Sequence, residues 1–185
     1  MKRFKIVMIL LYLGAIATAN VLTAKLMPVA VGPFIVPAGT FFIGATFVLR
    51  DLVQHAVGRK ATYGWIATAM ALSAVTSWAL GDTLWIVFAS AVTFLFSEAT
   101  DTELYTRLRL SIGKRVLLSG TVGSLLDSAI FVVIGLSPLG AGFLAWNEVG
   151  QAIMGQALIK TSMQFMGAFV VSQLFKLSSA NPYSR

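Results

Sequence analysis

The chain consists of six long apolar segments that alternate with shorter polar ones. Each apolar segment has roughly the 20 residues that a helix needs to cross the hydrocarbon core of a bilayer. Pro28 and Pro37 bracket a stretch that we expect to be irregular. The pattern predicts an all-α integral membrane protein, a bundle of six transmembrane helices in a single domain that covers residues 1–185. The expected helices span residues 6–23, 36–53, 61–80, 83–109, 115–136 and 149–175.

The charges between the apolar segments predict how the chain lies in the membrane. Basic residues cluster before the first segment, after the second (Arg59 and Lys60) and after the fourth, whereas the loops after the third and fifth segments contain none. Lys25 is the only basic residue of the first loop. Cytoplasmic loops carry an excess of lysine and arginine. We therefore expect both termini in the cytoplasm.

The N-terminal segment also has the features of a secretory signal, with basic residues, an apolar core and a cleavage-like run from Ala17 to Ala19. Ala15 and Ala19 are small residues four positions apart, a spacing that suits close packing of helices. We expect the first helix to be retained and to pack in the bundle. Cleavage before Asn20 is the alternative.

Composition narrows the class of protein further. Hydrophobic residues make up 57% of the chain and charged residues 11%, which is too little charge to cover a soluble domain of 185 residues. The net charge of +7 forms no basic stripe with interleaved aromatics, so we expect no nucleic-acid partner. With no cysteine and a single histidine, His55, we expect no metal site and no cofactor. Motifs for ATP hydrolysis and for standard hydrolases are absent, so we do not expect an enzyme.

Two oppositely charged residues lie deep in the last two apolar segments. Asp127 and Lys160 each lie about twelve residues into their segment, where a lone charge costs roughly 2.5–3.5 kcal/mol. We expect them to form a buried ion pair. Gln156 and Gln164 flank Lys160 at i−4 and i+4 and extend its polar face. A pair that only fixes the helix register is the alternative.

Polar residues at helical spacing also mark the other segments. Glu98, Asp101 and Tyr105 fall on one face of the fourth segment. Together the polar faces indicate a net acidic cavity inside the bundle, which suits a cationic solute, a hydrogen-bond donor or protons. The candidate substrate-binding residues are Asn20, Asp51, Glu98, Asp101, Tyr105, Asp127, Gln156 and Lys160.

Two other charged residues have simpler explanations. Arg50 lies near the cytoplasmic end of the second segment, where a long side chain can snorkel to the membrane surface. We expect it to serve as an anchor. Asp82 stands where the fourth segment begins, and we expect it to cap that helix.

At these positions the chain resembles the queuosine-precursor transporter family, also called the vitamin uptake transporter (VUT) family. The resemblance extends over residues 17–160. The similar elements are the small-residue run that leads to Asn20, Asp51 followed by Gly58, the element with Glu98, Asp101 and Tyr105, Asp127 with Ser128 and Phe131, and Lys160. The chain departs from many members at His55 and Val57, which replace a carboxylate and a tyrosine, and at Arg50, where a small hydroxyl residue is common.

The resemblance implies a transporter of the bacterial inner membrane that takes up a 7-deazaguanine base, preQ0 or preQ1, for tRNA modification. A carboxylate can accept the N1–H and the 2-amino group of such a base in a bidentate pair. We expect Asp101 or Glu98 in that role, beside the ion pair of the last two segments. Tyr105 is a candidate to stack on the ring.

Three other interpretations stay open. The first is a binding subunit that resembles the substrate-capture (S) components of energy-coupling-factor (ECF) importers, which also have six helices and need an ATPase partner. In that case Ala15 and Ala19 would dock on the coupling subunit. The others are an intramembrane enzyme that uses acidic side chains and a structural membrane subunit. Partners besides the small-molecule substrate and the lipid bilayer, such as a coupling ion or a second copy of the chain, also stay open.

Overall fold

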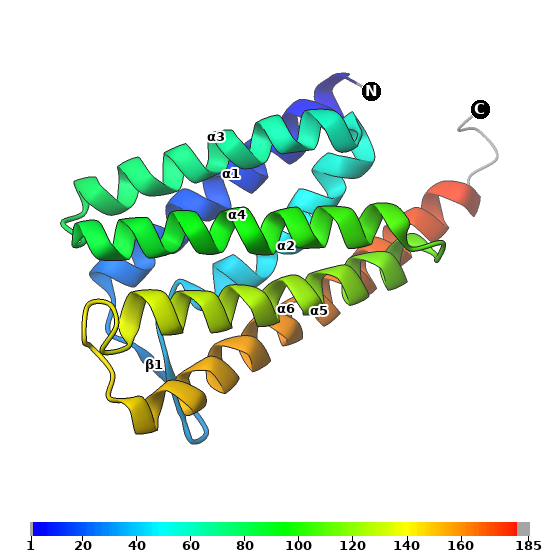
Figure 1. Ribbon diagram of the computed structural model, residues 1–185. Coiled ribbons are helices and arrows are strands. Elements are labelled where there is room, and N and C mark those ends of the chain that lie inside the picture. The colour runs from blue at the N-terminus through cyan, green and yellow to red at the C-terminus, as the bar shows by residue number, and fades with distance from the viewer. Residues whose placement is uncertain (1, 181–185) are drawn as a thin grey trace.

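The computed structural model describes the backbone of residues 2–180 and the side chains of residues 3–173. This part of the chain contains six α-helices, one short π-helix and one two-stranded hairpin (Figure 1). The α-helices are α1 (Lys2–Lys25), α2 (Thr40–Val57), α3 (Arg59–Ala79), α4 (Leu84–Arg107), α5 (Ile112–Ile130) and α6 (Trp146–Ala180). An all-α architecture with six helices agrees with the prediction from the sequence.

The fifth helix differs from the single regular helix that we expected over residues 115–136. Helix α5 gives way to a π-helix, η1 (Phe131–Leu136). The amide of Ser137 donates to the carbonyl of Val132 at 2.9 Å, which is the i→i−5 bond of a π-helical turn. Such turns are rare and occur frequently at functional sites.

The residues between the first two helices form a β-hairpin and not the irregular stretch that we expected. Strands β1 (Val29–Val31) and β2 (Phe34–Val36) pair antiparallel. Gly32 has φ +57°, a conformation that glycine adopts without a steric penalty, and it forms the turn together with Pro33. Gln151 of α6 donates to the carbonyl of Pro33 at 2.8 Å. The prolines that suggested a loop lie outside the strands, where they remove no ladder hydrogen bond.

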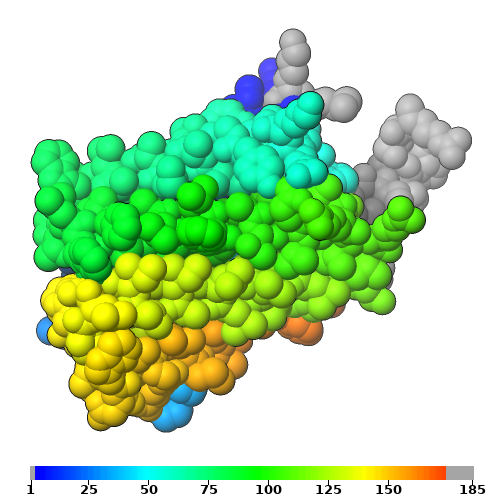
Figure 2. All heavy atoms as spheres, viewed as in Figure 1, coloured from blue at the N-terminus to red at the C-terminus, as the bar shows by residue number. Residues whose placement is uncertain are grey.

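Helix α2 lies at the centre of the bundle. It contacts every other α-helix, and the outer helices contact one another in the order α1, α3, α4, α5, α6. Figure 2 shows α4 packed between α3 and α5 on one face of the molecule. Gly39, just before α2, lies so close to α1 that a Cβ there would come within 2.2 Å of the carbonyl oxygen of Ala19. Ala19 is therefore an internal packing residue, as its spacing from Ala15 indicated.

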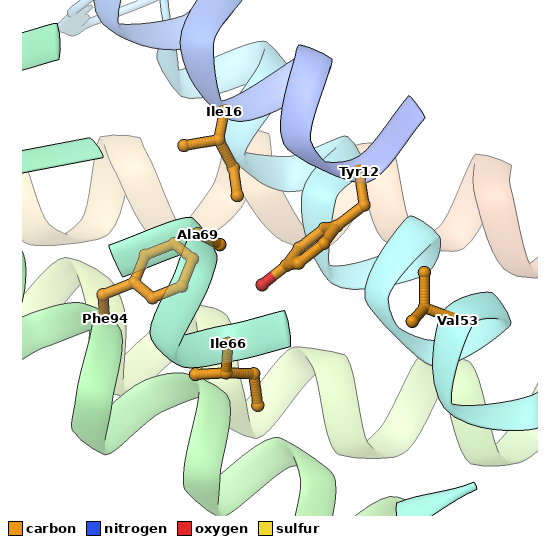
Figure 3. Close-up of a cluster of buried hydrophobic side chains, with 6 residues drawn as sticks. All are labelled: Tyr12, Ile16, Val53, Ile66, Ala69 and Phe94. Carbon is orange, nitrogen blue, oxygen red and sulfur yellow. The ribbon is translucent and has the colours of Figure 1, made fainter. Parts of the chain in front are cut away.

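The molecule exposes apolar side chains and buries charged ones, the reverse of a soluble protein. Leu10 of α1, Phe96 of α4 and Phe169 of α6 are all more than half exposed, whereas Arg50 of α2 is fully buried. An apolar cluster around the fully buried Tyr12 joins α1, α2, α3 and α4 (Figure 3). Apolar side chains on the outside of a bundle can contact the apolar lipid tails without the cost of exposure to water, so this distribution indicates a membrane protein.

Within the described residues, three stretches of helix are long and apolar enough to cross a membrane. They are α1 from Arg3, α4, and α5 together with η1. Helices α2 and α6 each bury charged side chains inside the bundle. Arg50 and Asp51 of α2 and Lys160 of α6 are at most 2% exposed.

The loops divide between the two ends of the bundle (Figure 1). The start of α1, the α2–α3 junction, the α4–α5 loop and the end of α6 lie at one end, which holds the clustered basic residues and is called the basic end below. The hairpin, the α3–α4 turn and the η1–α6 loop lie at the other, called the hairpin end. This is the distribution that alternating crossings require, while the orientation in a membrane stays a prediction.

Candidate functional site

A cavity of about 410 Å³ lies in the half of the bundle nearer the hairpin end. Six α-helices and η1 contribute to its wall. Phe94, Phe131 and Phe143 make much of the wall apolar, and serine and threonine hydroxyls interrupt it. The volume falls within the range of natural small-molecule sites. The cavity is therefore large enough to hold a ligand the size of a purine.

Asp127 of α5 and Lys160 of α6 form an ion pair in the wall of this cavity. The Nζ of Lys160 lies 2.5 Å from Oδ2 of Asp127. It also lies 3.1 Å from Oγ of Ser128 and 3.1 Å from Oε1 of Gln156, so each of the three ammonium donors is used. The other oxygen of Asp127 accepts only a long hydrogen bond, 3.4 Å, from the hydroxyl of Ser97. The ion pair that the sequence predicted is present.

Asn20 lies in the same wall and ties α1 to α3. Its side-chain amide donates to the hydroxyl of Thr76 at 2.6 Å, and to the hydroxyl and the carbonyl of Ser73 at 3.1 Å. Two N–H donors shared among three acceptors of α3 fix the position of α1 against α3. Removal of residues 1–19 would therefore take away one wall of the cavity.

Asp82 belongs to the cavity and is not the helix cap that we expected. Thr83 is the N-cap of α4, because its Oγ1 accepts a hydrogen bond from the amide of Ile86 at 3.3 Å. Asp82 instead accepts a hydrogen bond from the hydroxyl of Ser77, and both residues line the cavity. Aspartate and threonine are both good caps, and only the local backbone decides between two neighbours.

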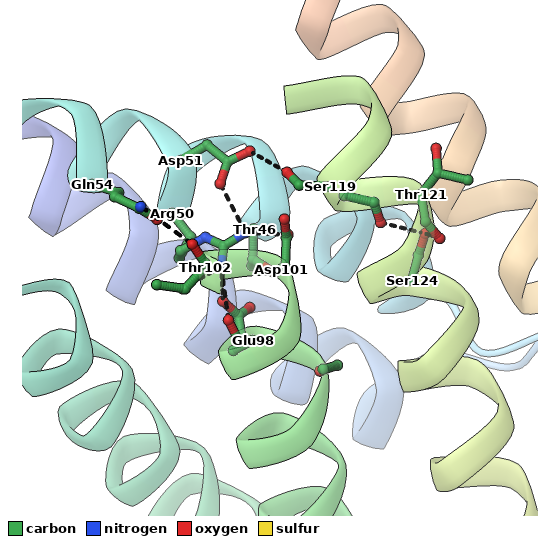
Figure 4. A network of polar contacts seen from close by, with 12 residues as sticks. Thr46, Arg50, Asp51, Gln54, Glu98, Asp101, Thr102, Ser119, Thr121 and Ser124 are labelled. Carbon is green, nitrogen blue, oxygen red and sulfur yellow. Dashed lines mark hydrogen bonds and ion pairs between the residues drawn. The ribbon is translucent and has the colours of Figure 1, made fainter. Parts of the chain in front are cut away.

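A second polar cluster is buried between α2, α4 and α5 (Figure 4). At its centre, Nη2 of Arg50 lies 2.8 Å from Oδ1 of Asp51 and also contacts Oδ2 of Asp101. The Nη1 atom lies 2.9 Å from the carbonyl oxygen of Glu98, 3.5 Å from its carboxylate and 2.7 Å from Oγ1 of Thr102. These five residues are called the Arg50 network below.

The burial of Arg50 contradicts the anchoring role that we expected. Its side chain is fully buried and does not reach the membrane surface. Depth along α2 suggested snorkelling, but the direction of a side chain depends on the helix face, and this face of α2 meets α4. Gly123 of α5 helps to close the cluster, because a Cβ there would come within 3.0 Å of the Cβ of Asp101 and 2.9 Å of the ring of Phe47.

The structure divides the eight candidate residues between two places. The cavity is lined by Asn20, Asp127, Gln156 and Lys160. The other four candidates do not line it: Asp51, Glu98 and Asp101 belong to the Arg50 network, and Tyr105 is buried nearby. The sequence placed all eight around one cavity, since helical spacing shows which residues share a face but not where that face points.

The two places lie at different depths in the bundle and meet through α4. Asp101 lies six residues before the basic end of α4, about 9 Å at 1.5 Å per residue. Asp127 lies fifteen residues from the basic end of α5, about 22 Å away. Ser97, whose hydroxyl contacts Asp127, is followed directly by Glu98 of the Arg50 network. The Arg50 network is therefore nearer the basic end and adjoins the cavity at Asp127, on the side called its deep end below.

Tyr105 is held by Arg115 of α5 and does not stack in the cavity. The guanidinium of Arg115 lies 4.0 Å from the centre of the Tyr105 ring and donates to the Tyr105 carbonyl at 2.7 and 2.9 Å. This cation–π contact covers one face of the ring. The aromatic rings of the cavity are those of Phe94, Phe131 and Phe143, which the sequence analysis missed, because an apolar residue that faces a cavity shows the same pattern as one that faces lipid.

Comparison with known proteins points to the same class of protein. Residues 77–174, just over half of the chain, match the family described as putative vitamin uptake transporter. Searches of the curated proteins and of the solved structures found no significant match. The chain belongs to this transporter family. The matched region contains the Asp127–Lys160 pair and the acidic residues of α4.

Proposed function

We propose that this chain imports a 7-deazaguanine base, preQ0 or preQ1, across the bacterial inner membrane, with the cavity as its binding site. The observation that carries the proposal is the Asp127–Lys160 pair in the wall of a cavity that is large enough for a purine. Charged side chains deep in a membrane protein are costly and usually line the path of a solute. The family match supports uptake of a small molecule, and the resemblance to queuosine-precursor transporters supports the deazaguanine base.

The polar groups of the cavity complement the edge of such a base. The base presents its N1–H and 2-amino donors side by side, and a carboxylate accepts both in a bidentate pair. Asp127 offers that carboxylate, since its Oδ1 has only a long contact of 3.4 Å and its Oδ2, which already accepts from Lys160, can accept a second hydrogen bond. The amide nitrogen of Gln156 would donate to O6 of the base, or Lys160 would do so in exchange for its contact with Ser128 or Gln156. The role that we expected for Asp101 or Glu98 thus passes to Asp127, which lines the cavity.

The rest of the cavity wall can contact the ring of the base and its substituent. Phe94, Phe131 and Phe143 provide apolar surface on which a flat heterocycle can stack. Asp82 lies in the same wall and would attract the aminomethyl cation of preQ1, which preQ0 lacks. This cavity therefore favours preQ1 over preQ0.

We further propose six membrane crossings with both termini in the cytoplasm. The clustered basic residues share one end of the bundle, and such residues are enriched in cytoplasmic loops. The cavity would then face the outside, as uptake requires. Reporter fusions after Lys60 and Lys114 should report the cytoplasm, and fusions at Asp82 and Ala141 should report the outside. A cytoplasmic signal at Asp82 would rule out this topology.

Thermal unfolding of the purified full chain tests the substrate. Both preQ1 and preQ0 should raise the unfolding temperature of the parent protein, whereas adenine should not, because its edge does not offer the same pair of donors. Asp127→Asn keeps the shape of the side chain but replaces an acceptor oxygen with a donor, so stabilisation by both bases should be lost. Glu103→Gln, a change outside the cavity on α4, is the matched control. Equal stabilisation of parent and Asp127→Asn would refute the site.

Uptake in cells tests the transport step. In bacteria that cannot make the precursor, the parent chain should restore queuosine in tRNA when preQ0 or preQ1 is supplied. Asp127→Asn should not restore it at the same level of expression. If the parent chain is expressed normally and restores no queuosine with either base, the proposed substrate is wrong.

The packing of α1 argues against the alternative interpretation of a capture subunit that depends on an ATPase partner. That interpretation placed Ala15 and Ala19 on a docking face, but Ala19 is 1% exposed and packs against Gly39. Proteoliposomes that contain only this chain distinguish the two interpretations. A carrier should exchange external for internal preQ0, whereas a capture subunit alone would bind the base without moving it.

A further inference from the structure

The Arg50 network contains more negative than positive charge. Three carboxylates, those of Asp51, Glu98 and Asp101, surround one guanidinium. All four residues are at most 1% exposed. If every group were ionised, the network would hold two uncompensated negative charges. Carboxylates that share a buried site repel one another, so an additional positive charge would stabilise this cluster.

Several polar atoms of this region lack hydrogen-bond partners among the described residues. Both oxygens of Asp101, Oδ1 of Asp51 and Oε2 of Glu98 have no hydrogen-bond partner in the described part of the chain, although some of them form ion-pair contacts with Arg50. The hydroxyl of Tyr12 is also fully buried without a partner, and it points from α1 into the bundle (Figure 3). Buried polar groups without partners are rare in native proteins and call for a functional explanation.

Glu98 has the weakest contact with Arg50 of the three carboxylates. Its Oε2 lies 3.5 Å from Nη1, whereas Asp51 lies 2.8 Å from Nη2 and Asp101 touches the same nitrogen. Glu98 also follows Ser97, whose hydroxyl contacts Asp127 in the wall of the cavity. A change of charge at Glu98 therefore occurs next to the residues that line the cavity.

The surroundings of Glu98 suit a proton better than a metal ion. Within the part of the chain that the structure describes, no three His, Cys, Asp or Glu side chains are arranged to hold a metal ion. A protonated carboxyl group keeps its shape and can donate to a neighbouring carboxylate or hydroxyl. The charged and titratable groups that face Glu98 are Tyr12 of α1, Arg50 and Asp51 of α2, Asp101 of α4 and Asp127 of α5.

We propose that Glu98 is a proton-binding site and that its protonation is coupled to import. The coupling rests on the proposed function, in which the cavity with Asp127 and Lys160 holds the solute. A proton on Glu98 removes one of the two excess charges beside the deep end of the cavity. Base and proton then enter together, and release of the proton into the cytoplasm drives accumulation of the base.

Infrared difference spectroscopy of the purified full chain tests the proton site without any substrate. The difference between acidic and alkaline samples should contain the carbonyl band of a buried protonated carboxyl group, and Glu98→Gln should remove it. Glu103→Gln is the matched control, because Glu103 lies on the same helix but pairs with Arg59 outside the network. Absence of the band in the parent, or its survival in Glu98→Gln, overturns the proposal.

Folding of the variant is itself informative. Glutamine matches a neutral carboxyl group in size and keeps a donor and an acceptor, so Glu98→Gln should fold like the parent. If Glu98→Gln does not fold while Glu98→Asp does, the position requires a charge, and a neutral Glu98 is excluded.

Transport by proteoliposomes that contain only this chain tests the coupling. With the membrane potential held at zero, a gradient of about one pH unit should support about tenfold accumulation of preQ0 if one proton accompanies each base. Glu98→Gln should lose this accumulation but keep exchange of labelled for unlabelled preQ0, because exchange needs no net movement of protons. Accumulation driven by a sodium gradient at equal pH, or full pH-driven accumulation by Glu98→Gln, would refute proton coupling.

The two measurements separate this inference from the choice of substrate. If the parent chain neither binds nor exchanges preQ0 or preQ1, the substrate proposal fails. The infrared band and its loss in Glu98→Gln then decide by themselves whether Glu98 binds a proton.

Discussion

The two polar sites of this bundle bury charge in different ways. The Asp127–Lys160 pair balances one negative with one positive charge, uses all three ammonium donors and lies in the wall of a cavity. The Arg50 network sets three carboxylates against one guanidinium and lies outside that cavity. A balanced pair beside a cavity can exchange its contacts for those of a ligand. An unbalanced, enclosed cluster responds to the gain or loss of charge, which supports separate places for recognition and coupling.

The largest effect should follow the removal of the central cation of the network. Arg50→Ala leaves three buried carboxylates without a counter-charge, and breaking a buried pair in this way costs about 3–5 kcal/mol. We expect little folded protein after extraction, as measured by size-exclusion chromatography and thermal unfolding. Arg50→Lys should be intermediate, because an ammonium group cannot reach every partner of the guanidinium.

A rescue experiment separates the loss of the counter-charge from the loss of packing. Arg50→Met combined with Asp51→Asn and Asp101→Asn removes most of the charge with little change in volume, and it should recover folded protein. If Arg50→Ala alone is as stable as the parent, the attraction between the guanidinium and the carboxylates does not hold the network together.

Removal of the cation beside the cavity should cost less. In Lys160→Ala the remaining Asp127 is 8% exposed and can turn toward water in the cavity, so we expect a loss of about 1–3 kcal/mol in thermal unfolding. The double change Asp127→Asn with Lys160→Gln should restore stability but not uptake of preQ0. A loss in Lys160→Ala as large as that in Arg50→Ala would remove the distinction between the two sites.

The helices and the ion pair of the cavity could be predicted because both follow from position along an apolar segment. Asp127 and Lys160 carry opposite charges at similar depth on consecutive segments, and each needs a partner at that depth. The family resemblance rested in part on the same positions. The fold and one of the two sites were therefore accessible from the sequence.

The division into two sites was not accessible, because it depends on how each helix is rotated about its own axis. The depth of Arg50 suggested a surface anchor, whereas the face it occupies turns it toward Glu98 and Asp101. Asp82 matched a helix cap by residue type, but the backbone gave that role to Thr83. The first outcome is decided by contacts between segments and the second by the local backbone, and periodicity encodes neither.

A smaller effect should distinguish the two bases within the cavity. Asp82→Asn removes the carboxylate that would attract the aminomethyl cation of preQ1, and the affinity for preQ1 should fall about three- to tenfold. The affinity for preQ0 should not change, because preQ0 lacks the cation. Titration calorimetry with both bases measures the difference. Equal losses of affinity for the two bases would show that Asp82 shapes the cavity and does not recognise the aminomethyl group.

The smallest effect should come from the acidic residue of α4 that lies outside both sites. Glu103 pairs with Arg59, accepts a hydrogen bond from Tyr63 at 2.6 Å and lies 3.4 Å from Arg107, and the Arg59 side chain is half exposed. Exposed ion pairs are screened by water and salt, so Glu103→Gln should not measurably change thermal unfolding or preQ0 uptake. Glu98 and Glu103 are five residues apart on one helix and differ mainly in burial. If Glu103→Gln impaired folding or uptake as much as changes in the Arg50 network, the effects assigned to that network would be general to acidic residues of α4.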